Sequence, residues 1–515
     1  MASLFDVQYT VKDGMRDMFL KSIEMNQIAE KSRIETGNIS YEYSIPNELN
    51  NVVNLREIWN SREDQTKHTL SPHFQILKEI KEKYVLDTQM KIHEVYVVKK
   101  NNRPVNKSVV VPGSKSMTNR ALLLAAMSNE KSRLRGVLFS DDSRHFLECL
   151  ESIGFKLEIN EEDNIVDIYG CGGEIPLKEG SIDVGSAGTA ARFLTAMLAL
   201  SDGSYTINCS EQMERRPMKD LFDVLTMLGA KFEYLHEKFH LPVKVTGNGR
   251  KSQNIDMDIS KSTQYLSAML MVTPILNNDI NIHITSEKKD GSYIRITRKM
   301  LKEFGVKVEF DGENYKVFGG QHIHIGDYYI EPDVSAACYF YGMAALLGGS
   351  MVVKNVHFNS TQGDLKFLEV LEKMGCILED TEEGIKLTGS GTLSGIDIDM
   401  NDFSDQALTL AAIAPFADST TWIRNIGHIR GQECNRMSAI INELSKCGVN
   451  CKEIENDIII EPGIVGKAVI ETYDDHRVAM AFTLMGLKCS GIIIDNPMCC
   501  RKTFEGFYDV LETCI

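Results

Sequence analysis

A short helix that ends in glycine and is followed by a strand recurs along the 515-residue chain, and this repeat restricts the fold more than any other feature. Two of its copies read FLECLESIGFKLE and LFDVLTMLGAKFE, and a shortened last copy, FYDVLETCI, ends the chain. Each full copy predicts an amphipathic helix that stops at a glycine C-cap. The five glycines lie 70 to 76 residues apart, at Gly154, Gly229, Gly305, Gly375 and Gly448.

A second kind of helix recurs six times at the same period. Its copies are apolar at nearly every position, which is typical of a helix that is buried on all sides, yet each begins with capping or charged residues. Three copies lie before residue 331 and three after it, which predicts two three-fold modules of buried helices walled by sheet. The six sequences are KSMTNRALLLAAM, GTAARFLTAMLAL, STQYLSAMLMVTP, DVSAACYFYGMAALL, SDQALTLAAIAPF and DHRVAMAFTLMGL.

The polar N-termini of these helices predict an anion-binding cleft between the two modules. Free N–H groups and the helix dipole attract phosphate and carboxylate at a helix start. One such helix alone is explained as well by an ordinary capped core helix with a solvated first turn. Six of them, together with charged residues on the intervening loops, favour a polyanion site; those loop residues are Arg216, Glu433, Arg436 and Lys502.

The charge and the cysteine pattern restrict the partners and the compartment. The formal net charge is -16, which argues against nucleic acid or an anionic membrane as the main partner. The first residues, MASLFDVQYTVKDG, form no signal peptide, and no apolar run is long enough to span a membrane. Twelve cysteines without CxxC pairs are typical of a reduced protein. We therefore expect a cytoplasmic protein that binds neither nucleic acid nor membrane.

The segment from His236 to His240 matches the HExxH pattern of zinc peptidases, which needs a helix to bring both imidazoles to one face. Its surroundings, KFEYLHEKFHLPVKVTG, instead predict two short strands around a turn. We expect no zinc site there.

Seven motifs in the later four-fifths of the chain carry a resemblance to a known family. They are PGSKSMTNRALLL, SAGTAARFL, MERRPM, STQYLSAMLM, RGQECNR, YDDHRVAM and CCRKTF. With them, the chain from about Arg103 to Ile515 resembles 5-enolpyruvylshikimate-3-phosphate synthase. The resemblance implies an α/β fold, a two-domain inside-out α/β barrel of six βαβαββ-type repeats over residues 104–515. One half would comprise about 116–331, and the other about 104–115 plus 332–515.

The resemblance also implies the reaction. This family transfers the enolpyruvyl group of phosphoenolpyruvate to the 5-hydroxyl of shikimate 3-phosphate and releases phosphate, on the route to chorismate and the aromatic amino acids. It needs no metal and no organic cofactor. Glyphosate occupies the phosphoenolpyruvate site in this family, and Gly188 leaves room for it. An enolpyruvyl transferase that acts on another phosphorylated cyclic alcohol remains the alternative.

The site residues follow from the same resemblance, motif by motif. Phosphoenolpyruvate would contact Lys115, Gly188, Arg216, Gln264, Arg436, Arg477 and Lys502. Shikimate 3-phosphate would contact Lys115, Ser116, Arg120, Ser262, Thr263, Gln264, Asp405, His428 and Gln432. Asp405 would accept the proton of the attacking hydroxyl, Glu433 would act as acid and base at carbon, and Lys115 would complete the catalytic set. Taken singly, each acid could equally be a helix cap or a solvated loop charge.

The chain departs from the family pattern at several contact positions. Gln432 replaces a substrate-binding lysine, Asn435 an aspartate, and His428 an asparagine. Asp290 occupies the position of a phosphate-contacting serine, for which Ser292 is the nearest substitute. These replacements affect the contacts to shikimate 3-phosphate rather than the reaction class.

Residues 1–98 lie outside the repeat and predict a separate domain. Their order of elements, βαββαβ, is ferredoxin-like. The phrases EKSRIETGNISYEY and LREIWNSREDQTKHTLSPHF resemble the antibiotic-biosynthesis monooxygenase family of small dimeric α+β domains. Some members oxidise quinols or degrade haem without a bound metal or flavin. The candidate site residues are Trp59, His68 and His73, although both histidines could instead be helix caps and dimer contacts.

The front domain could therefore be a quinol-type monooxygenase or a binding and dimerisation module, and we expect a homodimer through it. Residues 99–103, KKNNR, predict a short polar linker. Because six copies of both helix types follow this linker, the sequence predicts that the transferase repeats are complete without the first 98 residues.

Overall fold

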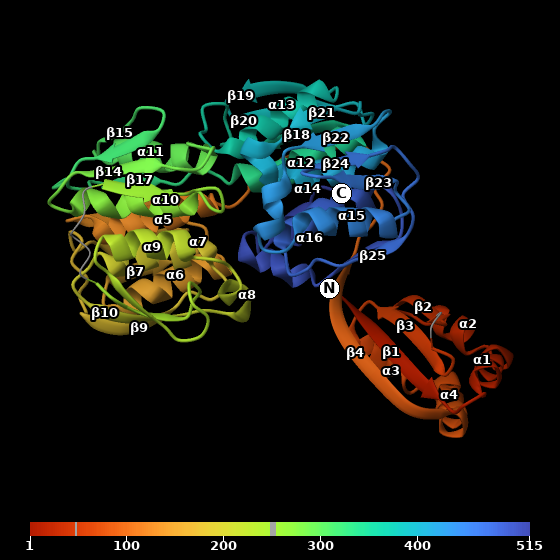
Figure 1. Cartoon of the computed structure of the whole chain (residues 1–515). Coiled ribbons are helices and arrows are strands. Elements are labelled where there is room, and N and C mark those ends of the chain that lie inside the picture. The colour runs from red at the N-terminus through yellow and green to blue at the C-terminus, as the bar shows by residue number, and fades with distance from the viewer. Residues whose placement is uncertain (47–48, 248–253) are drawn as a thin grey trace.

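The computed structural model describes residues 1–46, 49–247 and 254–515. It consists of a front domain at the N-terminus, a first lobe and a second lobe, drawn in Figure 1 in red to orange, mainly yellow to green, and mainly blue. Within these described ranges, no helix has both the length and the apolar character that a membrane crossing requires.

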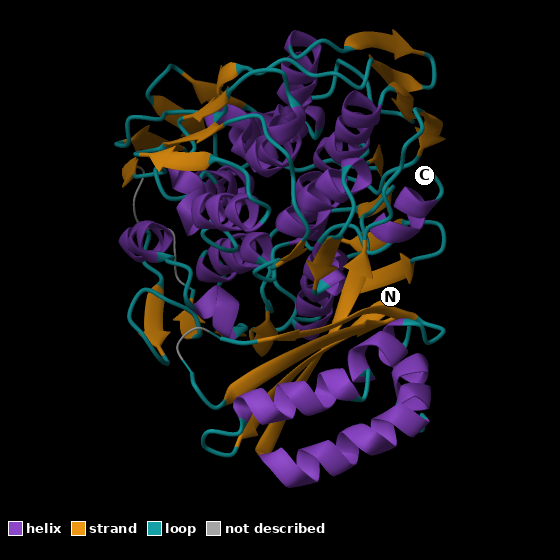
Figure 2. Cartoon of the chain, turned by 90° about the vertical axis from the view of Figure 1, so that its right-hand side faces the viewer, coloured by secondary structure: helices purple, strands orange, loops and turns teal. Residues whose placement is uncertain are grey.

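The front domain has the βαββαβ order that the sequence predicts, with each helical segment divided into two helices. Its four antiparallel strands lie in the order β2-β3-β1-β4, and its helices cover one face of this sheet (Figure 2). Ser61 and Ser71 cap two of these helices with their side chains. The elements are β1 (Ala2–Val11), α1 (Arg16–Met25), α2 (Ile28–Arg33), β2 (Asn38–Ser44), β3 (Val52–Trp59), α3 (Arg62–His68), α4 (Pro72–Tyr84) and β4 (Val85–Val97).

The first lobe holds three units of strand, buried helix, strand, amphipathic helix and hairpin. Its elements are α5 (Lys115–Met127), β6 (Lys131–Arg135), α6 (Asp141–Ser152), β7 (Lys156–Asn160), β8 (Ile165–Tyr169), β9 (Glu179–Asp183), α7 (Gly188–Ala199), β10 (Ser204–Asn208), α8 (Glu211–Glu214), α9 (Lys219–Met227), β11 (Lys231–Tyr234), β12 (Val243–Thr246), β13 (Asn254–Met257), α10 (Gln264–Val272), β14 (Ile280–Ile284), α11 (Ser292–Glu303), β15 (Val308–Phe310), β16 (Asn314–Val317) and β17 (Asp327–Tyr329).

The second lobe repeats this plan, with short 3-10 helices at several loops. Its elements are β5 (Val105–Val109), α12 (Val334–Leu347), β18 (Gly349–Val353), η2 (Gly363–Leu365), α13 (Lys366–Lys373), β19 (Ile377–Thr381), β20 (Gly384–Gly389), β21 (Asp397–Asp399), η3 (Asn401–Gln406), α14 (Ala407–Ile413), β22 (Thr421–Arg424), α15 (Arg436–Lys446), β23 (Cys451–Ile454), β24 (Asp457–Ile460), β25 (Ala468–Ile470), α16 (His476–Lys488), β26 (Ile492–Asp495), η6 (Pro497–Lys502) and α17 (Phe507–Glu512).

Both predicted helix types are confirmed. The helices α5, α7, α10, α12, α14 and α16 are the apolar ones, and α7 is buried at every position. The amphipathic helices are α6, α9, α11, α13, α15 and α17. Five of them are followed by a glycine with positive φ, from 77° at Gly448 to 111° at Gly229. Only glycine adopts this conformation without steric cost, which explains why these helices stop where they do.

The two lobes exchange a strand. β5 precedes α5 in the chain but pairs in parallel with β18 of the second lobe. β17 precedes α12 but pairs in parallel with β6 of the first lobe. The chain therefore crosses between the lobes twice, and the two crossings are hydrogen-bonded together: the amide of Ser114 donates to Glu331 at 2.8 Å, and that of Asp333 donates to Pro112 at 2.8 Å.

The sixth unit differs from the other five, which each have a four-stranded sheet of one parallel pair and an antiparallel hairpin. Among the described residues, no hairpin follows α17. Instead β4 of the front domain pairs antiparallel with β26, and β1 pairs with β4. The result is one six-stranded sheet, β2-β3-β1-β4-β26-β25, shared by the front domain and the second lobe.

The expectation that the repeat is complete without residues 1–98 is therefore wrong for the sixth unit. The segment after β4 is also bound to the second lobe, because the amide of Val98 donates to Ile492 at 3.1 Å and that of Asn101 donates to Leu487 at 2.9 Å. Tyr96 on β4 packs on Tyr508 of α17, with ring centroids 4.1 Å apart, and its hydroxyl donates to Glu512 at 2.6 Å. The periodicity of the helices could not show this, because a missing hairpin leaves no trace in a helix pattern.

Candidate active site

A cleft of about 920 Å³ lies between the two lobes. The N-terminal ends of α5, α7, α10 and α11 line it from the first lobe. The second lobe contributes η3, the loop before α15 and the start of α16. Most of the residues that the sequence proposes as ligands lie in this lining: Lys115, Ser116, Gly188, Arg216, Ser262, Thr263, Gln264, Asp405, His428, Gln432, Glu433, Arg436 and Arg477.

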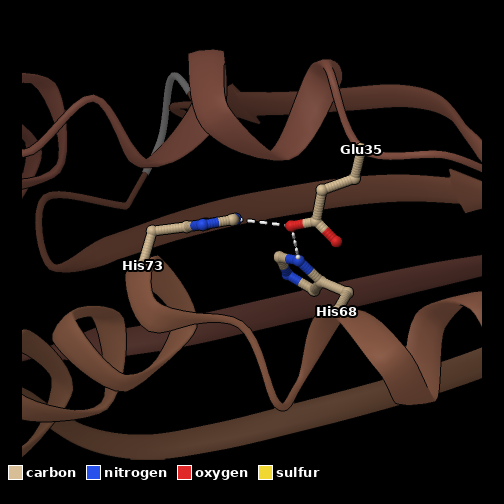
Figure 3. Close-up of side chains that lie close together, drawn as sticks. All are labelled: Glu35, His68 and His73. Carbon is tan, nitrogen blue, oxygen red and sulfur yellow. Dashed lines mark hydrogen bonds and ion pairs between the residues drawn. The ribbon is translucent and has the colours of Figure 1, made fainter.

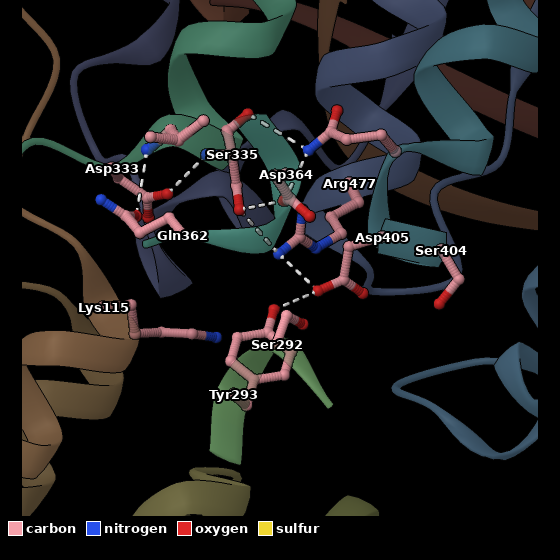
Figure 4. A network of polar contacts seen from close by, with 12 residues as sticks. Lys115, Ser292, Tyr293, Asp333, Ser335, Gln362, Asp364, Ser404, Asp405 and Arg477 are labelled. Atoms are coloured by element: carbon pink, nitrogen blue, oxygen red, sulfur yellow. Dashed lines mark hydrogen bonds and ion pairs between the residues drawn. The ribbon is translucent and has the colours of Figure 1, made fainter. Parts of the chain in front are cut away.

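Asp405 lies at the centre of a polar network in the cleft (Figure 4). Its carboxylate binds Arg436 at 2.9 Å and Arg477 at 3.1 Å, and accepts a hydrogen bond from the hydroxyl of Tyr293 at 2.6 Å. Tyr293 belongs to α11 of the first lobe, so this bond joins the two lobes. Burial raises the pKa of Asp405, but the two guanidinium groups together lower it by more than burial raises it. The pKa of Asp405 therefore lies below its ordinary value. The side chain is therefore a carboxylate, as a proton acceptor must be.

Glu433 lies on the loop before α15, beside two groups that hold it as a carboxylate. Its Oε2 is 3.3 Å from the ammonium of Lys502 and 3.2 Å from Nδ1 of His476. Burial raises the pKa of Glu433, yet Lys502 and His476 lower it well below its ordinary value. Lys502 belongs to η6 and lies behind Glu433 rather than in the cleft lining, so it contacts the cleft through this carboxylate.

Lys115 is the first residue of α5, and its side chain extends toward Tyr293 in Figure 4. Its ammonium lies 3.3 Å from the carboxylate of Asp142, which is buried and also lines the cleft. Ser116 follows it in the first turn of the same helix. This helix start therefore presents a cation together with free backbone N–H groups, which is the arrangement that binds a phosphate.

Gly188 begins α7 at a place where a side chain would push two arginine side chains away from the helix start. A Cβ atom there would lie 2.5 Å from a terminal nitrogen of Arg216 and 2.7 Å from one of Arg192. Arg192 is buried and donates to the side-chain oxygen of Gln264 at 2.7 Å, which orients this amide. The glycine thus lets two guanidinium groups approach the helix start closely.

Arg120 lies behind the cleft instead of in its lining. It is 1 % exposed, and all of its nitrogen atoms donate hydrogen bonds within the first lobe, to the side chains of Thr297 and Ser267 and to the carbonyl oxygens of Ser116 and Tyr293. In this form of the chain Arg120 positions the starts of α5 and α11. Its role as a substrate ligand remains a prediction.

The departures from the family pattern have distinct local explanations. Asp290 turns away from the cleft to Arg295 at 3.3 Å, whereas Ser292 lines the cleft. Asn435 caps α15 by accepting from the amide of Ser438 at 3.2 Å, which an aspartate would also do. His428 lies 2.8 Å from Ser404 and is therefore held at the cleft wall.

Among the cleft residues that the sequence analysis missed, Tyr293, Lys288 and Asp364 make the most informative contacts. Tyr293 and Lys288 reach across from the first lobe, where Lys288 lies 3.5 Å from the carboxylate of Asp402. Asp364, on η2, lies between Arg477 and the buried amide of Gln406, which donates to it at 2.9 Å. Burial and the neighbouring Asp405 raise the pKa of Asp364 to about 6. Its position on the same type of loop as Glu433, in NSTQGD, is the signal that could have identified it.

The structure brings the three candidates of the front domain together and adds a fourth residue. The rings of Trp59 and His68 are 4.8 Å apart, and those of His68 and His73 are 5.5 Å apart. Glu35 lies between the two histidines (Figure 3). By contrast, His236 and His240 lie on a turn between β11 and β12, as expected, and each is hydrogen-bonded to Glu214.

Two family models match the chain in adjacent segments. The model described as EPSP synthase (3-phosphoshikimate 1-carboxyvinyltransferase) matches residues 99–511, and the one described as antibiotic biosynthesis monooxygenase matches residues 5–79.

Curated proteins and solved structures agree with the longer match. The 3-phosphoshikimate 1-carboxyvinyltransferase of Nostoc punctiforme is 42% identical over 408 residues, which are 79% of this chain and 96% of that protein. The Vibrio campbellii protein of the same name is 39% identical over 419 residues, 80% of this chain and 98% of that protein. A solved EPSP synthase from Acinetobacter baumannii superposes with a TM-score of 0.69 at 25% identity, covering 81% of this chain and 97% of that one.

Proposed function

Because the chain belongs to the EPSP synthase family, we propose that the cleft between its lobes binds phosphoenolpyruvate and shikimate 3-phosphate. The chain transfers the enolpyruvyl group of the first to the 5-hydroxyl of the second and releases phosphate, in aromatic amino acid biosynthesis. The single observation that best supports this site is the pairing of two carboxylates, Asp405 and Glu433, with cations of the second lobe, in a cleft that Lys115 and Arg216 line from the first lobe. Two anionic substrates need those cations, and proton transfer needs those acids.

The proposed reaction begins at oxygen. The 5-hydroxyl attacks the central carbon of phosphoenolpyruvate and gives its proton to Asp405. The methylene carbon takes a proton from Glu433 and becomes a methyl group, which leaves a tetrahedral ketal. Glu433 then removes a methyl proton, the bond from carbon to the phosphate oxygen breaks, and phosphate leaves. Asp405 thereby transfers a proton at oxygen and Glu433 transfers protons at carbon. General acid–base catalysis needs such a positioned side chain at each reacting atom.

Glu433 must carry a proton before it can act as the acid. Its pKa is depressed by Lys502 and His476 in the free cleft. A bound phosphoenolpyruvate adds negative charge beside the same cations and competes for them, which raises the proton affinity of the carboxylate. We infer that substrate binding loads the proton onto Glu433.

We propose the ligand assignments that the motifs imply. Lys115, Arg216, Arg436, Arg477 and Lys502 surround phosphoenolpyruvate, with Gly188 and Gln264 beside them. The residues that hold shikimate 3-phosphate are Ser116, Arg120, Ser262, Thr263, His428 and Gln432, together with Lys115, Gln264 and Asp405. Ser292, which lines the cleft, takes the phosphate contact that Asp290 cannot make.

We further propose that the transferase comprises residues 104–515, with β4 of the front domain completing the sheet of its sixth unit, and that it works in the cytoplasm. Its twelve cysteines are all free thiols, which suits a reducing compartment. A homodimer would use the face of the front-domain sheet that carries no helices. This face holds an Asp6–Arg56 ion pair of 2.8 Å and a hydrogen bond between Gln8 and Asn54, so such an interface would be polar. Sedimentation of the full chain tests it.

Growth of a bacterial host that lacks its own EPSP synthase tests the proposed pathway role. The full chain should restore growth without aromatic amino acids, whereas Asp405→Asn should not. An enzyme for another phosphorylated cyclic alcohol would fail to restore growth although it is expressed and folded. That outcome would favour the alternative substrate and count against the proposal.

A further inference from the structure

A compact cluster in the front domain places three metal-binding side chains around one point, far from the transferase cleft. Glu35 follows α2, His68 ends α3, and His73 lies in the first turn of α4. Oε1 of Glu35 lies 2.8 Å from Nδ1 of His68 and 2.5 Å from Nε2 of His73 (Figure 3). One ligand atom from each of the three residues lies within 4.8 Å of the other two.

These separations suit a tetrahedral ion. Zinc bonds of about 2.0–2.1 Å to imidazole and carboxylate place neighbouring ligand atoms about 3.4 Å apart. The two spacings from Oε1 of Glu35 are shorter than this value, so small side-chain rotations that move Glu35 away from both imidazoles convert the hydrogen-bonded cluster into three ligands. Two imidazoles and one carboxylate leave a fourth position open, as in metal sites that bind water or a substrate.

The charge around the cluster also favours a divalent cation. Glu57 is buried, and its Oε2 lies 3.9 Å from Nε2 of His68, so two carboxylates flank this imidazole. In the part of the chain that the structure describes, no lysine or arginine forms an ion pair with Glu35 or Glu57. A divalent ion balances the two negative charges.

The second layer of contacts has the form that supports a metal-bound imidazole. Glu57 faces the ring nitrogen of His68 that Glu35 does not use, and it is held by the indole N–H of Trp59 at 2.9 Å and by Gln65 at 3.4 Å. That nitrogen of His68 is buried and has no hydrogen-bond partner among the described residues. At 3.9 Å Glu57 is too far for a hydrogen bond to this nitrogen, but a small shift of either side chain would form one, and a carboxylate bonded to a ligating imidazole fixes its orientation.

An ion can reach the cluster from one side. The side chain of His68 is fully buried, whereas those of Glu35 and His73 are 21% and 11% exposed. The route from solvent therefore passes Glu35 and His73. From the donor set, the charge and the access, we propose that Glu35, His68 and His73 bind one divalent transition-metal ion of the zinc class.

The proposed metal site differs from what the family resemblance of the front domain predicts, because that resemblance implies chemistry without a bound metal. It does not depend on the transferase function. The open fourth position on this ion would hold water or a small molecule. The rings of Trp59 and Phe74 lie against His68 and would be close to that ligand.

Zinc binding to the full chain, after treatment with a chelator, tests the proposal by calorimetry. We expect one zinc per chain, with Glu35→Gln and His73→Ala each weakening binding by at least about 100-fold, because each removes a direct ligand. Glu57→Gln should weaken it by about 10–100-fold, as expected for a residue behind a ligand. Cobalt(II) substitution should give a visible absorption band of low coordination number, lost in His73→Ala.

Two controls keep the test decisive. His322 and His324 form an exposed pair whose rings are 6.4 Å apart, and replacing both with alanine should leave the tight site unchanged. Near-UV circular dichroism and thermal unfolding, each compared with wild type, show that every variant is folded. If the wild-type chain binds no zinc stoichiometrically, or if Glu35→Gln and His73→Ala bind it as tightly as wild type, the assignment is wrong.

Discussion

At the scale of single residues, function depends on the pKa values of three carboxylates, which burial raises and neighbouring cations lower. Asp405 and Glu433 are both buried, yet neighbouring cations lower the pKa of each. Asp364 lacks a close cation, since Arg477 is 3.9 Å away, and its pKa is raised to about 6. These carboxylates of one cleft thus titrate in different pH ranges, which is how a site separates acid from base.

Loss of either proposed proton-transfer group should lower turnover far more than it raises the Michaelis constants. Asp405→Asn and Glu433→Gln keep the shape of the side chain but remove its charge, and proton transfer typically contributes about 10²–10⁴-fold. Phosphate-release kinetics measure this. Asp327→Asn, which breaks an exposed ion pair with Arg135, should leave turnover unchanged. Wild-type turnover in both cleft variants would refute the assigned roles.

Gly188→Ala should raise the Michaelis constant for phosphoenolpyruvate and weaken inhibition by glyphosate. The new methyl group meets Arg216 at 2.5 Å, so this guanidinium has to move away from the helix start. Competition kinetics with phosphoenolpyruvate measure both effects. Gly463→Ala, where nothing lies within 4 Å of the added carbon, is the matched control. Unchanged inhibition in Gly188→Ala would mean that the pocket is arranged differently.

Asp364 makes the free energy of unfolding fall as pH rises, whereas an acid in an ion pair makes it rise. Its pKa rises from an ordinary 3.8 to about 6 on folding, chiefly through burial. The protonated form therefore contributes stability that is complete below pH 3.8 and is lost as pH rises through about 6. The pKa difference corresponds to about 3 kcal/mol.

Asp364→Asn cannot ionise, so it should become more stable relative to wild type as pH rises from about 4 to about 7. Urea unfolding at several pH values measures this difference. The same comparison for Asp327→Asn should show no such trend, because that side chain is exposed. If the difference in the free energy of unfolding between wild type and Asp364→Asn stays constant across this pH range, the pKa of Asp364 is not raised.

At the scale of elements, the helices were predictable and their strand partners were not. An apolar stripe or a glycine C-cap is local information, so both helix types and their order could be derived from the sequence. The exchange of β5 and β17 between lobes agrees with the division into halves that the family resemblance implies, but no local pattern predicts it or the pairing of β4 with β26, because both depend on which edges meet in space. The same applies to Asp364 and Glu35: their roles come from burial and neighbours that lie far away in the chain.

The pairing of β4 with β26 predicts where the chain can be shortened. A chain that begins at Arg103 loses β4 and exposes the edge of β26, whose Ile492 and Ile494 are fully buried in the whole protein. An exposed apolar edge promotes aggregation, and η6, which carries Lys502, directly follows this strand. We expect this chain to lose at least about tenfold in turnover, equivalent to about 1.4 kcal/mol.

A chain that begins at Ile92 is the matched control, because it keeps Val95, Tyr96 and Val97, the residues that pair with β26. It should fold and keep turnover within a few-fold of the full chain. Melting temperature and phosphate release are measured for both. Equal behaviour of the two shortened chains would show that β4 is not part of the transferase.

At the scale of the whole molecule, two lobes form one site and a third unit is joined to it by a sheet. The cleft is assembled from helix starts of both lobes, and bonds such as Tyr293 to Asp405 already cross it. The front domain is continuous with the sixth unit through β4 (Figure 1). An ion bound at Glu35, His68 and His73 would therefore lie in a domain that is mechanically connected to the segment carrying Lys502.

Phosphate release by the purified full chain, with phosphoenolpyruvate and shikimate 3-phosphate together, tests the central claim most directly. We expect turnover in the ordinary enzymatic range of about 1–10³ s⁻¹. Shikimate without its phosphate should support far less turnover, because the serine and threonine contacts proposed at Ser116, Ser262 and Thr263 then have no anion to bind. Folded protein that releases no phosphate from the two substrates would contradict the account.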